Sequence, residues 1–185
     1  MVIEADFQHA VKHPRSRQRF LNQLDLECAR PFITKLVYVS PLRNFLEGGH
    51  GPMNHSPGIF NGNISRIMVY PGAFTWRFHH TLNNFLSTLI DHEGHHAYER
   101  AIHPETRFYT LALALREPIS LISNCLDKPT LKASRFKIGK ELRAYQNQLK
   151  NSGARRVSQN YEEEIRYRCD FLAGALRETH EARLK

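Results

Sequence analysis

The chain has 185 residues, and its 26 Lys and Arg against 18 Asp and Glu give a formal net charge of +8 at pH 7. With 41% hydrophobic and 24% charged residues it has the composition of a globular domain, which excludes a disordered chain, a collagen and a coiled coil. Its three cysteines, Cys28, Cys125 and Cys169, form no C-x-x-C pair, so they indicate neither a disulfide framework nor a zinc ribbon. We therefore expect a single domain over 1–185 in a reducing compartment.

The first third of the chain, residues 1–63, combines a helix, a strand and a loop. Apolar side chains at helical spacing predict a helix in the second half of 1–30. β-Branched and aromatic residues predict a strand over 32–39. From 43 to 63 the chain is dense in Gly, Pro, Asn and His, which is typical of a long loop without secondary structure of its own. Such a loop is either a lid or inhibitory flap over a cleft or an ordinary surface loop.

The rest of the chain predicts one more strand followed by helices. A strand is expected over 64–70, and apolar residues with a 3.6 period predict a helix over 78–98. Further helices are expected from about 104 to 125, from 130 to 150, and from an N-cap at Asn160 to the C-terminus. This order predicts an α+β fold, with a small sheet first and a helical bundle after it.

No apolar run is long enough to span a membrane, since the longest, over 111–115, ends at Arg116 and Glu117. No leader segment is recognisable, because Glu4 and Asp6 interrupt the N-terminus. These features predict a cytoplasmic protein without a membrane partner. The sequence carries no signature of an oligomeric state.

The motif that carries chemistry lies in the helix expected over 78–98, where His92-Glu93-x-x-His96 matches the pattern H-E-x-x-H. Two imidazoles four residues apart lie one above the other on one face of a helix, so both can reach a Zn²⁺ about 2.1 Å from each nitrogen. The Glu between them is held beside the water that the metal binds. The pattern therefore predicts one zinc ion on His92 and His96, with Glu93 as the catalytic base.

The neighbouring residues support a buried site. On a helical wheel, Leu89 and the other apolar residues of this helix share one arc with the three residues of the motif. Ionisable side chains buried there without partners would destabilise the fold, and a metal supplies the partner. By the same wheel, Asp91 lies opposite this arc, which favours a solvated surface acid over the alternative that Asp91 orients a metal ligand, while His95 lies off the arc.

The motif resembles that of the zincin metallopeptidases, whose branches differ in the third zinc ligand. A metzincin would have the pattern H-E-x-x-H-x-x-G-x-x-H, but Glu99 stands in place of the glycine and Ile102 in place of the third histidine. A Glu on a later helix characterises the gluzincin, or thermolysin-like, branch. Residues 140–145, Lys-Glu-Leu-Arg-Ala-Tyr, resemble the E-x-x-A-Y segments of small bacterial gluzincin-like proteins. This resemblance implies Glu141 as the third ligand.

The position of Glu141 favours the same choice, because a helical wheel of 130–150 places it at the edge of the apolar stripe, where it can face a cleft. Residues 167–173 resemble the A-D-x-x-A stretch that follows the ligand Glu in many gluzincins, but Arg166 stands where that Glu would be. The acidic alternatives that stay open are Glu105, Glu117 and the run Glu162-Glu163-Glu164.

The resemblance implies a zincin fold, in which a small mixed sheet packs on the active-site helix, and a zinc-dependent metallopeptidase that acts on a peptide or protein. Residues 64–150 would form its metal-binding core and 151–185 a C-terminal helix. An edge strand of such a sheet aligns the extended substrate, and the strand over 64–70 is either this edge strand or an ordinary core strand. Candidates for stabilising the oxyanion are Tyr145, His79, His80, His50 and His55.

The positive charge leaves other functions open. A nucleic-acid-associated protein is one, because basic residues cluster near the start and before the last helix, at Lys12, Arg15, Arg17, Arg19, Arg155 and Arg156. Basic runs are, however, usually solvated faces. The other is a zincin fold without activity that serves as an interaction protein, and the intact Glu93 argues against it.

Overall fold

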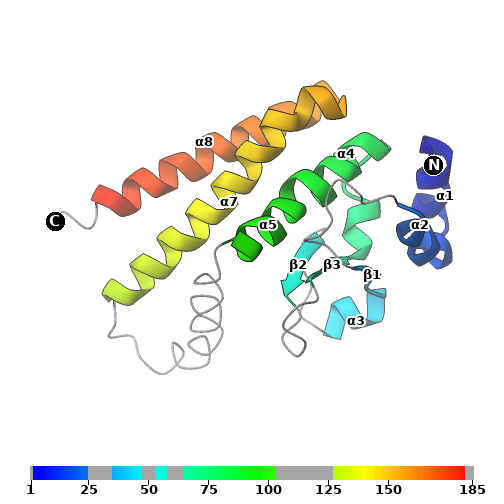
Figure 1. Ribbon diagram of the computed structural model, residues 1–185, viewed down its shortest axis with the longest axis horizontal. Coiled ribbons are helices and arrows are strands. Elements are labelled where there is room, and N and C mark those ends of the chain that lie inside the picture. The colour runs from blue at the N-terminus through cyan, green and yellow to red at the C-terminus, as the bar shows by residue number, and fades with distance from the viewer. Residues whose placement is uncertain (1, 25–34, 47–52, 58–64, 103–126, 182–185) are drawn as a thin grey trace.

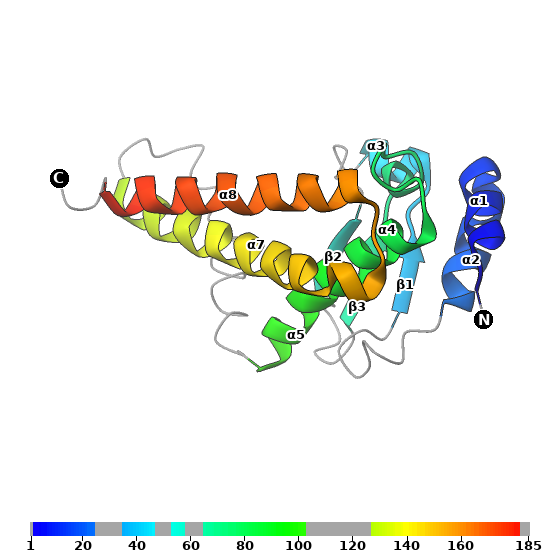
Figure 2. The same ribbon diagram turned by 90° about the horizontal axis from the view of Figure 1, so that it is seen from above.

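The computed structural model describes residues 2–24, 35–46, 53–57, 65–102 and 127–181 (Figure 1). The helix expected over 104–125, with Glu105 and Glu117, lies outside these residues, and so does His50. The chain is mostly helical with one small sheet, in agreement with the predicted α+β class. Two long helices extend as a pair to one side, and the sheet and the N-terminal helices lie at the other (Figures 1 and 2).

The described helices are, in chain order, α1 (Glu4–Lys12), η1 (Pro14–Ser16), α2 (Arg17–Gln23), α3 (Pro41–Leu46), η3 (Pro71–Phe74), α4 (Leu82–Leu86), the π-helix η4 (Ser87–Glu93), α5 (Gly94–Ile102), α7 (Asp127–Arg155) and α8 (Gln159–Glu181). Helices α4, η4 and α5 follow one another without a break and form one rod, which we call the site helix. Of the described helices, none combines the length and the apolar character needed to cross a bilayer.

The sheet has three strands in the order β1-β3-β2, where β1 is Lys35–Tyr38, β2 is Met53–Pro57 and β3 is Ser65–Val69. Strand β3 pairs with β1 in parallel and with β2 antiparallel, so the sheet is mixed. Of the two roles considered for the strand over 64–70, the substrate-binding edge strand is wrong, because β3 is bonded on both sides. The prediction that 43–63 has no secondary structure is also wrong, since β2 lies within it.

Two helix starts differ from the sequence prediction for local reasons. The helix expected from Phe78 begins at Leu82, because the hydroxyl of Thr81 accepts a hydrogen bond from the backbone N–H of Asn84 at 3.3 Å and caps it. The last helix begins at Gln159, and the carbonyl of Ser158 accepts the first backbone bonds, so Asn160 lies in the first turn and is not the N-cap.

The main core fixes one side of the site helix against the sheet and the N-terminal helices. Four phenylalanine rings form its centre, with ring centroids 5.2–6.3 Å apart, at Phe7, Phe20, Phe74 and Phe85. Leu89 and Ala97 of the site helix pack into the same cluster with Ile67 of β3. Fully burying one such large apolar side chain stabilises the fold by about 1.5–3 kcal/mol, so this core sets the position of the site helix.

The opposite side of the site helix packs against α7. Helix α8 runs beside α7, and a second apolar cluster of Tyr161, Ile165 and Cys169 joins them, with Trp76 and Phe78 packed against it. The site helix is therefore buried on two sides, one apolar and one facing α7.

One residue of the basic N-terminal cluster belongs to the interior. Arg17 is 5% exposed and donates to the carbonyls of Ala10 and Val11, both at 3.1 Å, and to the hydroxyl of Tyr38 at 2.9 Å. Its guanidinium also lies 4.7 Å from the centre of the Phe74 ring. Arg17 therefore joins α1, α2 and β1 and is not available to a polyanion.

We expect Arg17→Met to lower the free energy of unfolding by about 2–4 kcal/mol, because the acceptors that Arg17 satisfies lose a charged donor. The measurement is urea unfolding followed by circular dichroism. Arg19→Met, at an exposed position of the same helix, is the matched control and should change the stability by less than about 0.5 kcal/mol. Equal stability of the two variants would contradict the structural role of Arg17.

Candidate metal centre

Three side chains from two helices converge on one point. The Nε2 atoms of His92 and His96 lie 3.3 Å from Oε2 and Oε1 of Glu141, respectively. The three residues form the one group of potential metal ligands found in the described part of the chain, with their ligand atoms within 4.8 Å of one another. The structure thus brings together the three residues that the sequence predicted as ligands, although 45 positions separate Glu141 from His96 in the chain.

The two elements differ in how they present these groups. His92, at the end of η4, and His96, in the first turn of α5, are both buried, and their rings are 4.9 Å apart. Glu141 projects from the middle of α7 and is partly exposed. Ligand atoms about 2.1 Å from a tetrahedral Zn²⁺ lie about 3.4 Å from each other. Each histidine lies 3.3 Å from a different oxygen of Glu141, and the three ligand atoms lie within 4.8 Å of one another, which is near the spacing that one zinc ion requires.

The charge state of the group suits a cation. Burial opposes the ionisation of Glu141, but hydrogen bonds with His92 and His96 outweigh it and hold the pKa of the carboxyl well below its usual range. Burial lowers the pKa of His96, so its imidazole is neutral at pH 7. An ionised carboxylate beside a neutral imidazole is the state in which such groups bind a metal.

A cavity of about 310 Å³ opens beside the donors, with His92 and Glu141 in its wall. Glu93 lines the same cavity and is 7% exposed. The predicted base therefore lies in the same enclosed space as two of the predicted ligands, where a water molecule and a substrate carbonyl could meet.

Tyr145 lies against the first ligand, with its ring 4.3 Å from that of His92. Burial raises the pKa of its hydroxyl, so the group keeps its proton at neutral pH. Nη1 of Arg168 donates to the Tyr145 oxygen at 3.2 Å, and a guanidinium can only donate. The proton of Tyr145 therefore remains available for donation to another acceptor.

Sequence analysis missed Arg168, which also lines the cavity. Its Nε donates to Glu164 at 2.7 Å, and its guanidinium lies between the rings of Trp76 and Tyr145, at 5.6 and 5.7 Å. The available signal was its position in the stretch 167–173, which resembles a gluzincin segment. Of the acidic run on α8, Glu162 bonds to Arg166 and Ser152, and Glu164 lines the cavity and bonds to Arg168. None of the three acids belongs to the group of potential ligands found among the described residues.

His79, one of the oxyanion candidates, belongs to a buried chain of hydrogen bonds whose other side chains line the cavity. Its Nδ1 bonds to the carbonyl of Ala73 at 2.8 Å and must donate, so its Nε2 accepts from the hydroxyl of Thr88 at 2.7 Å. The Thr88 oxygen then accepts from the hydroxyl of Tyr161, which in turn accepts from Gln148 Nε2 at 2.6 Å. With both nitrogens engaged, His79 is not an oxyanion donor.

This chain of bonds predicts a pH dependence of stability. Burial lowers the pKa of His79 to about 4, against 6.5 in the unfolded chain. As the pH falls from 6.5 to 4, the unfolded state takes up a proton that the folded state does not. The contribution of neutral His79 to the free energy of unfolding is therefore fully present above pH 6.5. It decreases by up to about 3 kcal/mol as the pH falls to 4.

The measurement is the free energy of unfolding in urea between pH 4 and 7.5 for the wild-type protein and for His79→Asn. Asn keeps a donor for the Ala73 carbonyl but has no group that titrates in this range. The variant should be less stable at pH 7.5 and show a shallower loss toward pH 4. Parallel curves for the two proteins would mean that His79 does not titrate as expected.

The interpretation of Asp91 as a solvated acid is wrong. Asp91 is 5% exposed and accepts two hydrogen bonds from Arg155, at 3.1 and 2.9 Å. The helical wheel assumed one buried face, whereas the site helix is buried on two sides and Asp91 faces the end of α7. His95 lies off the centre, as expected, and pairs with Glu99 at 3.4 Å.

Glu99 is itself buried, and it also bonds to Arg143 of α7. Burial opposes its ionisation, but its bonds to His95 and Arg143 lower the pKa of the carboxyl to about 2. The residue that stands at the metzincin glycine position therefore ties α5 to α7.

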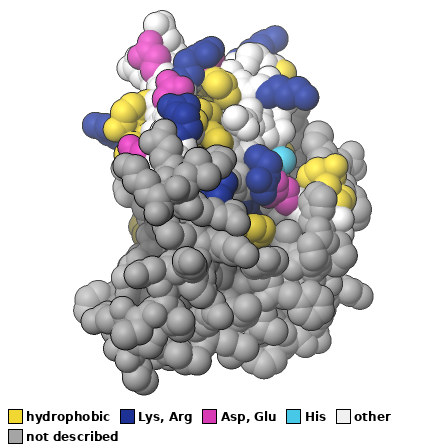
Figure 3. Space-filling view, turned by 90° about the vertical axis from the view of Figure 1, so that its left-hand side faces the viewer, with side chains coloured by type: hydrophobic (Ala, Val, Ile, Leu, Met, Phe, Trp, Pro, Cys, Tyr) yellow, Lys and Arg dark blue, Asp and Glu magenta, His cyan; other side chains and the backbone are white. Residues whose placement is uncertain are grey.

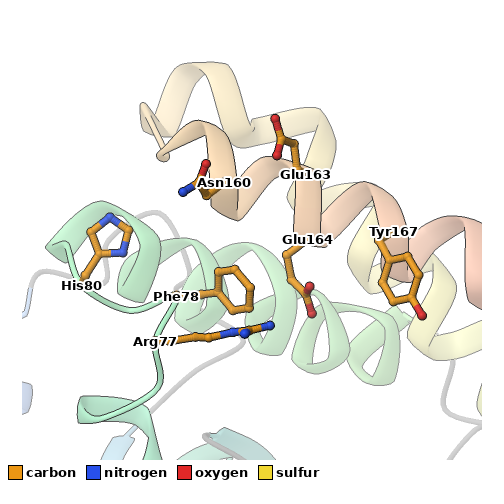
Figure 4. A pocket seen from close by; sticks show the side chains of 7 residues that line it. All are labelled: Arg77, Phe78, His80, Asn160, Glu163, Glu164 and Tyr167. Atoms are coloured by element: carbon orange, nitrogen blue, oxygen red, sulfur yellow. The ribbon is translucent and has the colours of Figure 1, made fainter.

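A second, more open hollow of about 600 Å³ adjoins the cavity, and Glu164 lines both. Arg77, Phe78 and His80 form one side of it, and α8 forms the other with Glu163 and Tyr167 (Figure 4). His80, another oxyanion candidate, therefore lies at this hollow and not beside the ligands. His55 is on β2, opposite Ile67.

On the end of the molecule shown in Figure 3, the described Lys and Arg side chains lie among acidic and hydrophobic ones. Arg17 and Arg155 make internal bonds, so two of the six residues that suggested a nucleic-acid partner are engaged within the fold.

Comparison with known proteins provides no relative from which a function can be transferred. No protein-family model, no curated protein and no solved structure matches the chain. The function of the centre must therefore be argued from the chemistry and geometry of its own residues.

Proposed function

We propose that the protein is a zinc-dependent metallopeptidase of the zincin type that hydrolyses peptide bonds. The observation that carries the proposal is the convergence of His92, His96 and Glu141, with ligand atoms within 4.8 Å, beside a cavity lined by Glu93. Two imidazoles and one carboxylate are a donor set that zinc hydrolases use, and it leaves a fourth position for water. The small mixed sheet and the core that holds the site helix against it are compatible with a zincin fold.

The three residues would hold one Zn²⁺. When bound, the ion would lower the pKa of a water molecule toward about 7 and polarise the scissile carbonyl. Glu93 takes the proton from the attacking water and delivers it to the leaving amine, because Glu93 lines the same cavity as His92 and Glu141. The low exposure of Glu93 keeps bulk water from competing for that proton.

Tyr145 donates its free proton to the oxyanion that develops on the scissile carbonyl. Arg168 supports this role, because it donates a hydrogen bond to the Tyr145 hydroxyl oxygen and does not use the hydroxyl proton. That proton can therefore be donated to the oxyanion. The extended substrate would pair with β2, which is an edge of the described sheet and packs against η4 and α5.

The proposal is tested by metal analysis of the purified protein followed by digestion of a peptide library. We expect one zinc ion per chain and cleavage that a chelator abolishes and added zinc restores. A protein that binds no transition metal under any loading condition, or that binds zinc and cleaves no peptide, contradicts the proposal.

Tyr145→Phe is expected to lower kcat by about 10²–10³-fold with little change in KM, because the lost donor acts on the oxyanion and not on the bound ground state. Steady-state kinetics on a peptide from the library measure both constants. Tyr167→Phe, an exposed tyrosine of α8, is the control. An unchanged kcat in Tyr145→Phe would assign the oxyanion to another donor.

A further inference from the structure

The segment that carries the motif is a π-helix. Residues Ser87–Glu93 form η4, and the backbone N–H of Gly94 still bonds five residues back, to the carbonyl of Leu89. π-Helical residues make up well under 1% of residues in proteins, since the geometry costs backbone stability, and they occur preferentially at functional sites. Some interaction must hold η4 in this form, and its contacts with α7 are the candidates.

Helix α7 binds the middle of η4 at one residue, Asp91, with three hydrogen bonds. Nδ2 of Asn147 donates to the backbone carbonyl of Asp91 at 2.7 Å. Nε and Nη2 of Arg155 donate to its two carboxylate oxygens, at 3.1 and 2.9 Å. We call this set of bonds the Asp91 clamp. It fixes both the backbone and the side chain of the residue that immediately precedes His92.

The histidines of the centre lack the usual means of orientation. A metal-binding imidazole normally donates from its second ring nitrogen to a carbonyl or carboxylate, which fixes the ring. The Nδ1 atoms of His92 and His96 are buried, and no described residue forms a hydrogen bond with either. The orientation of His92 therefore depends on the packing of Tyr145 against its ring and on the backbone that carries it.

The clamp has little value as a source of stability. In a buried ion pair, the electrostatic attraction roughly offsets the free energy needed to remove both charges from water. Apolar residues of the same size would therefore stabilise the contact equally well. Its value is geometric, because α7 also carries Glu141. The same helix thus supplies the third ligand, Glu141, and holds Asp91, the residue before the first ligand, so it influences the distance between the two ligands.

We propose that Asn147 and Arg155 are positioning residues of the metal centre: through Asp91 they hold η4 in its π-helical form and so place His92 opposite Glu141. This inference rests on the proposed function, since it assumes that the three residues bind zinc. It adds two residues that no metal-binding pattern contains.

The test measures the zinc dissociation constant by competition with a chromophoric chelator. It also records the visible absorption of the Co²⁺-loaded protein, which responds to coordination geometry. In Asn147→Leu, which keeps the size and removes the donor, we expect zinc affinity to fall by about 10- to 100-fold, as for other residues that orient ligands. Gln146→Leu, the neighbouring exposed amide, is the matched control and should bind as the wild type does.

Arg155→Lys keeps the charge beside Asp91 and therefore the fold, but it cannot form two parallel bonds. We expect a several-fold loss of zinc affinity and an altered Co²⁺ spectrum. Arg166→Lys is its control, because it changes an exposed ion pair with Glu162 on α8.

The outcomes separate the two proposals. If the wild type binds zinc and both clamp variants bind it equally tightly with unchanged Co²⁺ spectra, the clamp is only structural and the inference is overturned, whatever happens to the unfolding free energy. If the wild type binds no zinc, the proposed function fails and the inference fails with it.

Discussion

Glu93→Gln is expected to lower kcat for peptide hydrolysis by about 10²–10⁴-fold while the protein retains one zinc ion. Gln has the size of Glu and fits the same buried position, but its amide cannot accept the proton of the attacking water. Because Glu93 is not among the three converging donors, the metal content should not change. The measurements are steady-state kinetics on a library-derived peptide and elemental analysis of the same preparation.

Glu163→Gln is the matched control for this prediction, since it makes the same change at an exposed position of α8. It should retain full activity and zinc. Activity in Glu93→Gln within a few fold of the wild type would remove Glu93 from the mechanism. Loss of zinc in this variant would instead make Glu93 a ligand.

Removal of a ligand should have the second large effect. In His96→Ala and in Glu141→Ala we expect zinc affinity to fall by more than about 100-fold, because loss of a residue that only orients a ligand already lowers metal affinity by about 10- to 100-fold. Two donors cannot hold the ion that three donors hold, and activity should disappear with the metal. Competition with a chelator measures the affinity, and circular dichroism verifies that each variant is folded.

His95→Ala is the control for the histidine, because His95 neighbours His96 in the chain and pairs with Glu99 instead of Glu141. It should bind zinc as tightly as the wild type. Glu141→Ala separately tests the third ligand that the resemblance to gluzincins implies. Wild-type zinc affinity in Glu141→Ala together with loss in His96→Ala would place the third ligand elsewhere in the chain.

The local chemistry of the centre could be predicted from the sequence, and its surroundings could not. The spacing of His92 and His96 is a property of one helix. The resemblance of residues 140–145 to gluzincin segments implied Glu141, and the apolar stripe of α7 favoured it by placing it at the edge of the stripe. Arg168 bonds to Tyr145 and Asn147 bonds to Asp91, and both are contacts between helices. No spacing within one helix reveals such contacts.

The errors have the same origin. The wheel placed Asp91 in solvent because it took the site helix to have one buried side, whereas α7 covers a second side. The strand over 64–70 could not be recognised as central without β2, whose residues read as a loop because Met53–Pro57 contains Asn, His, Ser and Pro. In both cases a segment distant in the sequence, α7 or β2, determines the environment of the residues that were predicted wrongly.

The two sides of the site helix are held by forces of different kinds. On one side the phenylalanine core packs it against the sheet, and on the other α7 reaches it through bonded pairs of ionisable groups, Glu141 with His92 and His96, Arg143 with Glu99, and Arg155 with Asp91. Salt screens the most exposed of these pairs, Arg143 with Glu99, in which the arginine side chain is 51% exposed, and it hardly affects the apolar core. Amide hydrogen exchange should therefore reveal a hierarchy, in which the α7 side opens at a lower free energy than the sheet side and opens more readily as ionic strength rises.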